Sequence, residues 1–245
     1  MIGIMDSGLG GIVTLQHVLK YVKDTSFVCV ADQVNAPYGE KSIEELEIIA
    51  RKHLLWFRSK GIKTVVVACN TLCSTVIPKL KKEFVDMEIV DIISLTCNAL
   101  KNESLSNLLL LATKRSIESK VYEDNILRLF PNCKVYPVIP SLWVPSIENQ
   151  VDEVTLDAVV KDVVIDYVDK VDGVLLGCTH YPLLKKYIEK YLAVKMYDSC
   201  DAIVDAMVHE GKVHPTVCIY TSGDPVVTKK QVFDLLQMDV EVLKL

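Results

Sequence analysis

The chain has 245 residues, of which 50% are hydrophobic, so it can bury a large core in one large domain or two small ones. Its net charge of -5 and its lack of a basic run argue against nucleic acid as the main partner. No stretch approaches 18 uninterrupted apolar residues and the first residues form no charged leader, so we expect no membrane span, no signal peptide and a cytoplasmic protein.

Apolar runs that suit strands alternate with helical patterns along the whole chain. The expected strands lie at residues 1–5, 26–31, 65–68, 88–92, 107–112, 134–138, 174–177 and 216–220. The first expected helix ends near residue 23, and another begins near residue 71. Further helices are expected at 42–61, 116–130 and 152–168, and on both sides of the last strand. Ser42 to Glu45 has the form of a capping box, Gly61 is a stop signal, and Pro78 predicts a kink or early helix end. This alternation predicts two doubly wound α/β units.

Two of these strands end on a cysteine, and the two stretches resemble one another. Cys69 follows one buried apolar run and Cys178 follows another, and hydrogen-bonding residues come directly after each cysteine. Ligands of parallel sheets bind beyond the carboxyl ends of the strands. The start of the next helix favours negative charge, which makes a thiol there easier to ionise than one buried in apolar packing. The repeated pattern therefore predicts two thiols that face a common cleft.

The remaining cysteines favour a structural role, because free cysteine usually behaves as a small buried hydrophobe. Cys73 could pair with Cys69 in a C-x3-C arrangement, but this is not the spacing of a zinc ribbon or a thioredoxin. No second pair and no histidine cluster completes a site, so we predict no metal. Eight dispersed cysteines suit a reducing compartment.

The turn after the first expected strand contains Gly8, Gly10 and Gly11. This pattern matches neither a dinucleotide fingerprint nor a phosphate-binding loop. What remains is a tight turn that presents backbone N–H groups to a small anion, such as a substrate carboxylate. Asp6, just before the turn, could equally be an ordinary helix N-cap.

Five stretches then carry a family resemblance. They are Ala-Cys-Asn-Thr at 68–71, Gly-Cys-Thr-His-Tyr-Pro-Leu-Leu at 177–184, and residues 6–11, 35–42 and 221–225. Together they resemble the signatures of glutamate racemase, in the cofactor-independent aspartate/glutamate racemase superfamily, and they span nearly the whole chain. The resemblance implies two α/β domains related by pseudo-twofold symmetry, with the active site in the cleft between them. It further implies a first domain of 1–93 plus 201–245 and a second domain of 94–200.

The implied activity is the interconversion of L- and D-glutamate without cofactor or metal, to supply D-glutamate for peptidoglycan, by a protein that could form a homodimer. Racemisation needs one proton carrier on each face of the α-carbon, and a thiol with a pKa of about 8.5 can serve as base or acid near neutral pH. The alternatives are a related two-cysteine racemase for aspartate or another amino acid, and a binding protein without turnover.

The resemblance also assigns residues. The proposed catalytic groups are Cys69 with Asp6, and Cys178 with His180 and Glu148. The proposed substrate-binding residues are Asp6, Ser7, Pro37, Tyr38, Gly39, Asn70, Thr71, Thr113, Ser116, Thr179 and His180. From the sequence alone, Glu148 could be a solvated surface acid, and the loop of Tyr38 and Gly39 could be a plain surface turn.

The chain departs from the family pattern at two points. Thr113-Lys114-Arg115-Ser116 stands where the family commonly has Thr-x-Gly-Thr, and Leu72-Cys73 stands where Ala-Ser is usual. Arg115 would change the backbone of its loop or add charge near the pocket. Both departures leave the two cysteines in place, so they bear on selectivity and rate.

Overall fold

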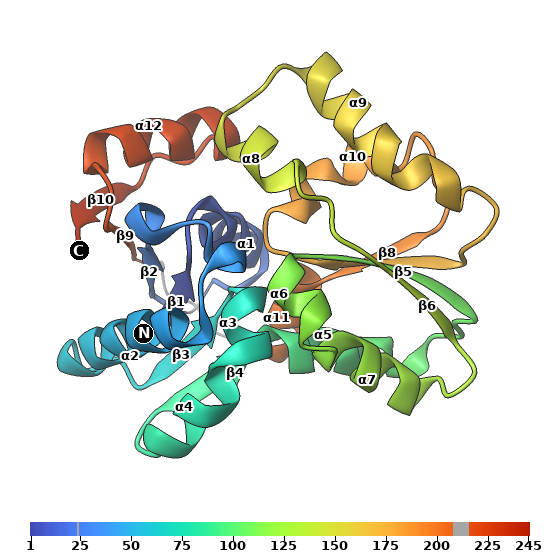
Figure 1. Ribbon diagram of the computed structural model, residues 1–245. Coiled ribbons are helices and arrows are strands. Elements are labelled where there is room, and N and C mark those ends of the chain that lie inside the picture. Colours follow the sequence, from blue (N-terminus) through green and yellow to red (C-terminus); the bar gives the residue numbers. More distant parts are fainter. Residues whose placement is uncertain (24, 208–215) are drawn as a thin grey trace.

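The computed structural model describes residues 1–23, 25–207 and 216–245, and it contains two parallel β-sheets. Six strands form the first sheet in the order β10-β9-β2-β1-β3-β4, and four form the second in the order β6-β5-β7-β8. The sheets lie beside one another with helices packed around them (Figure 1). The prediction of an α/β fold with two parallel units is confirmed.

The first sheet combines both ends of the chain. Its strands are β1 (Ile2–Asp6), β2 (Phe27–Ala31), β3 (Thr64–Val67), β4 (Glu88–Asp91), β9 (Val217–Thr221) and β10 (Glu241–Lys244). β9 pairs in parallel with β2, and β10 completes the edge. The C-terminal segment thus returns to the sheet that the N-terminus begins, while the exact domain boundaries stay a prediction, and residues 208–215 of the first domain lie outside the described ranges.

Several helices flank the first sheet or pack between it and the second sheet, and two of them follow predicted local signals. They are α1 (Leu9–Tyr21), α2 (Ile43–Ser59), α3 (Asn70–Thr75), α4 (Ile77–Glu83), α5 (Ile92–Ala99), α11 (Ser199–Met207) and α12 (Pro225–Leu236). The predicted capping box at Ser42 forms, with Glu45 bonding back to the Ser42 amide at 2.8 Å. The helix expected from residue 71 does break early, and Pro78 lies in the first turn of the next helix, where no N–H bond is lost.

The second sheet comprises β5 (Asn107–Ala112), β6 (Lys134–Val138), β7 (Gly173–Gly177) and β8 (Lys195–Asp198). Its helices are α6 (Lys114–Glu118), α7 (Val121–Leu129), α8 (Trp143–Glu148), α9 (Glu153–Val164) and α10 (Lys185–Ile188). The single helix expected over 116–130 is wrong, because Lys120 adopts a left-handed conformation with φ 57° and separates α6 from α7. The strand β8, the strand β10 and the helix α8 were not predicted.

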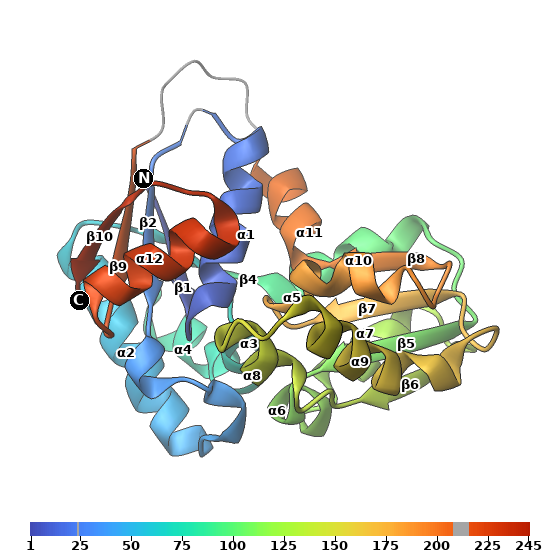
Figure 2. The same ribbon diagram turned by 90° about the horizontal axis from the view of Figure 1, so that it is seen from above.

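Hydrophobic packing ties the two sheets into one molecule. Leu108 and Leu110 of β5 join the large core that contains the first sheet, whereas Leu109 and Leu111 face a second core. This alternation leaves β5 buried on both faces, as parallel strands usually are. α11 packs against α1 and α5, between the two sheets (Figure 2). Among the described helices, none is both long and apolar enough to cross a bilayer.

Candidate active site

The two cysteines singled out by the sequence line one cavity of about 170 Å³. Cys69 directly precedes α3 at the carboxyl end of β3, and Cys178 follows β7 in the same way. One thiol comes from each sheet, and their residues are 5% and 6% exposed. The sulfurs are therefore shielded by packing but border the space in which a small ligand could lie.

The cavity gathers most of the predicted site residues and some that were missed. Eleven predicted residues line it: Ser7, Pro37, Tyr38, Gly39, Cys69, Asn70, Thr71, Thr113, Cys178, Thr179 and His180. Eight others were not predicted: Glu40, Lys114, Ile139, Pro140, Ser141, Val144, Pro145 and Tyr181. Five of these eight, residues 139–141, 144 and 145, follow β6. Because ligands bind beyond the carboxyl ends of parallel strands, the end of this expected strand could have predicted them.

Asp6, Ser116 and Glu148 are not among the cavity's lining residues in the described chain. All three residues lie behind the cavity. Each contacts either a residue that lines the cavity or a helix or strand that carries such a residue. Arg115 also lies off the cavity, and its neighbour Lys114 lines it instead. Any charge that the start of α6 adds to the cavity therefore comes from Lys114.

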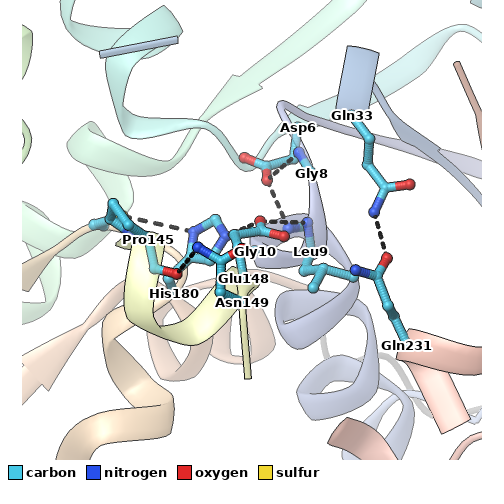
Figure 3. A network of polar contacts seen from close by, with 12 residues as sticks. Asp6, Gly8, Leu9, Gly10, Gln33, Pro145, Glu148, Asn149, His180 and Gln231 are labelled. Atoms are coloured by element: carbon cyan, nitrogen blue, oxygen red, sulfur yellow. Dashed lines mark hydrogen bonds and ion pairs between the residues drawn. The ribbon is translucent and has the colours of Figure 1, made fainter. Parts of the chain in front are cut away.

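Asp6 is fully buried at the end of β1. Its Oδ2 accepts bonds from the amides of Gly8 at 3.2 Å and Gly11 at 2.8 Å, at the start of α1 (Figure 3). Its Oδ1 has no hydrogen-bond partner among the described residues. Burial raises the pKa of Asp6, against the charge of His180 and the amide bonds. The carboxyl thus binds amides at the start of α1, although the N-cap position itself is held by Gly8, and it keeps one oxygen without a partner among the described residues.

The pKa of Cys69 is raised well above its ordinary value, because burial and the charge of Asp6 outweigh the amides of Leu72 and Thr71. The start of the helix does act in the expected direction, since its amides lower the pKa relative to that of a thiol in purely apolar packing. The amides do favour the thiolate, but desolvation is the larger effect. Burial and Asp6 thus favour the protonated form of Cys69.

Cys178 has a different neighbourhood, built around His180. The sulfur lies 3.8 Å from His180 Nδ1. On the other side of the ring, His180 Nε2 lies 2.7 Å from Glu148 Oε1 (Figure 3). Burial lowers the pKa of His180, but bonds to Cys178 and Glu148 outweigh burial and raise it well above its ordinary value. Glu148 also accepts a bond from the Leu9 amide at 3.4 Å, so it links α8 to the start of α1.

Hydroxyl groups connect the two halves of the cavity. Thr71 Oγ1 and Thr113 Oγ1 are 3.0 Å apart, and Thr113 Oγ1 is 3.0 Å from the hydroxyl of Ser116, which is buried behind it. Asn70 accepts a bond from Tyr122, while its buried Nδ2 has no partner among the described residues. A buried donor without a partner costs stability unless a ligand or water satisfies it. These groups suit a polar ligand that carries acceptor oxygens.

Close packing at Gly10 holds the two halves together at the site. A Cβ added there would lie 2.1 Å from Thr179 Oγ1 and 2.8 Å from His180 Nδ1. We therefore expect Gly10→Ala to lower the free energy of unfolding by about 1–3 kcal/mol, the usual range for overpacking, and to displace His180. Thermal unfolding followed by circular dichroism measures this. Gly39→Ala is the matched control, since its added carbon would come no closer than 3.5 Å to Thr113, and equal melting temperatures would contradict the clash.

Comparisons with known proteins agree with one another. The model of the Asp/Glu/hydantoin racemase family matches residues 2–207. Glutamate racemase 2 of Caldanaerobacter subterraneus subsp. tengcongensis is 33% identical over 205 residues, which cover 80% of this chain and 75% of that protein. Among solved structures, a glutamate racemase isoform of Bacillus anthracis superposes with a TM-score of 0.91 at 24% identity, covering 100% of this chain and 97% of that one. The glutamate racemase of Francisella tularensis, in complex with D-glutamate, gives 0.86 at 24% identity, covering 100% and 96%.

Proposed function

Because the chain belongs to the Asp/Glu/hydantoin racemase family, we propose that it interconverts L- and D-glutamate by proton transfer between Cys69 and Cys178. The single observation that carries this proposal is that the two thiols, one from each sheet, border the same cavity. Inversion at a carbon requires a proton to leave one face and another to reach the opposite face. Two carriers held on separate halves of the protein suit that requirement.

In one direction of the reaction, Cys178 acts as the base and Cys69 as the acid, and the contact between His180 and the Cys178 sulfur supports this assignment. In that direction, Cys178 removes the α-proton and Cys69 donates its proton to the opposite face. The product leaves with its proton count unchanged, and the enzyme then holds the proton on Cys178. The reverse reaction, or exchange with water, restores the starting protonation state, so each thiol must act as both acid and base.

The neighbouring ionisable groups have distinct roles in this proposal. His180, held by Glu148, stabilises the thiolate of Cys178 with its positive charge. Asp6 acts on the side of Cys69 from behind the cavity, where its charge raises the pKa of that thiol and its unpaired oxygen assists proton exchange there. Ser7, Asn70, Thr71, Thr113 and Thr179 would hydrogen-bond the substrate and hold its α-carbon between the sulfurs.

Glutamate is the proposed substrate because the relatives reported above are glutamate racemases by name. The biological role, the location and the assembly of the protein belong to the same proposal. The D-glutamate formed would supply peptidoglycan synthesis, the protein would act in the cytoplasm, and it could act as a homodimer.

The test is incubation of the purified protein with L-glutamate in D₂O without pyridoxal phosphate. We expect the circular dichroism signal to decay to zero and the α-proton signal to disappear from the NMR spectrum. L-Aspartate, run in parallel, should change much more slowly. Racemisation that required added pyridoxal phosphate would refute the mechanism, preference for aspartate would refute the substrate, and binding without deuterium uptake would indicate a protein without turnover.

A further inference from the structure

One side of the cavity is formed by residues 37–41, which we call the wall segment. Pro37, Tyr38, Gly39 and Glu40 all line the cavity, and the segment connects β2 to α2 of the first sheet. It also reaches the other half of the molecule, because the helical turn of Tyr38–Glu40 packs against α6. The position of the wall segment therefore sets the width of the cavity between the two halves.

Asp32 holds the wall segment from its own side. This carboxylate is fully buried and does not line the active-site cavity. It accepts a bond from the Tyr38 hydroxyl at 2.7 Å and two bonds from the Asn35 side chain, at 2.8 and 3.0 Å. His53 Nε2 lies 3.1 Å from the same carboxylate. Burial opposes the charge, but the bonds from His53, Ser222 and Tyr38 outweigh it and hold the pKa of Asp32 well below its usual range.

Arg115 holds the wall segment from the opposite side. Its Nε donates to the backbone carbonyl of Lys41 at 3.0 Å, across the junction between the two halves. Its Nη1 bonds Glu118 of the same helix at 3.2 Å, which fixes the guanidinium in place. The residue that departs from the family pattern thus contacts the last residue of the wall segment rather than the cavity.

We propose that Asp32 and Arg115 are positioning residues, which hold the wall segment over the bound substrate from the two halves of the protein. Neither side chain touches the cavity, so neither can act on the substrate directly. Each acts through a bond to the wall segment, Asp32 through the Tyr38 hydroxyl and Arg115 through the Lys41 carbonyl. The kinetic part of this proposal rests on the proposed racemase function.

The kinetic test compares Asp32→Asn, Tyr38→Phe and Arg115→Met with the wild-type protein. We expect KM for L-glutamate to rise roughly 5- to 20-fold while kcat changes less than about 3-fold, since a loosened wall weakens binding of substrate and transition state alike. Tyr38→Phe combined with Asp32→Asn should raise KM by less than the product of the two single effects, because both changes weaken the bond between Tyr38 and Asp32.

Matched variants separate positioning from general destabilisation. Arg115→Lys keeps a cationic donor and should retain most of the wild-type KM, unlike Arg115→Met. Arg128→Met removes an exposed arginine of α7 that bonds Asn125 on its own helix, and it should leave KM and kcat unchanged. An unchanged KM in Arg115→Met would refute the role of Arg115, and unchanged values in both Asp32→Asn and Tyr38→Phe would refute that of Asp32.

A second measurement does not depend on turnover. Hydrogen exchange of peptides covering residues 33–41 should speed up in Asp32→Asn and in Arg115→Met, but not in Arg128→Met, while peptides from β5 and β7 keep wild-type rates. If the wild-type protein does not racemise glutamate, the proposed function fails, and this experiment still decides whether the wall segment is held. If Asp32→Asn does not fold, Tyr38→Phe, Arg115→Met and Arg115→Lys still show whether the wall segment is held. Wild-type exchange in all folded variants would overturn the proposal.

Discussion

Racemisation of glutamate should fall at least about 10³-fold in Cys69→Ser and equally in Cys178→Ser, because each substitution removes one of the two proton carriers. A serine hydroxyl keeps nearly the same shape but is a far weaker acid than a thiol, so it can serve neither as base nor as ready acid near pH 7. The loss should be in kcat, with KM changing little, since the rest of the cavity remains. Circular dichroism with L- and D-glutamate measures both directions.

The control for these variants is Cys73→Ser. Cys73 lies on the same short helix as Asn70, does not line the cavity, and donates to the Val67 carbonyl at 3.1 Å, a bond that serine can also make. We expect its activity to stay within a few-fold of wild type. Wild-type turnover in Cys69→Ser or in Cys178→Ser would remove that cysteine from the mechanism.

His180→Leu should produce the second largest loss, roughly 10²-fold in kcat, within the range of a general acid–base partner. The substitution removes the positive charge 3.8 Å from the Cys178 sulfur and leaves Glu148 without its ionic partner in a mostly buried position. His180→Asn, which can still donate a bond to sulfur but carries no charge, should lose less. The ranking wild type, Asn, Leu is the expected result of steady-state measurements.

Alkylation of the thiols provides an independent readout for His180. Because the thiolate is the reactive form, the rate at which iodoacetamide modifies Cys178 at pH 7 should fall in His180→Leu, as measured by peptide mass spectrometry. Modification of Cys69, which lies on the other sheet, should change little. An unchanged rate at Cys178 would show that the imidazole does not stabilise the thiolate.

The sequence predicted best where one strong local signal sufficed. The apolar runs before Cys69 and Cys178 are fully buried strands, since an uninterrupted apolar stretch of this length has few other places in a fold. Elements without such a signal were missed. β8 and β10 are short edge strands with lysine at one end, and α8 contains Pro145, which is tolerated because it lies in the first turn.

Contacts across the molecule could not be predicted from local patterns. Nothing near Lys120 signals the break between α6 and α7, since no glycine or proline is present there. The bond from Arg115 to Lys41 and the approach of Gly10 to Thr179 join residues that are 74 and 169 positions apart. Such pairs depend on how two separate sheets pack, so they appear only in the complete structure.

The return of the C-terminal strands to the first sheet has a consequence for the order of assembly during synthesis. β9 pairs with β2, and the partners Phe27 and Val217 are 190 positions apart, so the six-stranded sheet stays incomplete until β9 and β10 have been synthesised. The four strands of the other sheet lie within residues 107–198 and emerge earlier. We therefore expect residues 107–198 to gain protease resistance first in nascent chains, with the N-terminal strands following only after β9 and β10 have emerged.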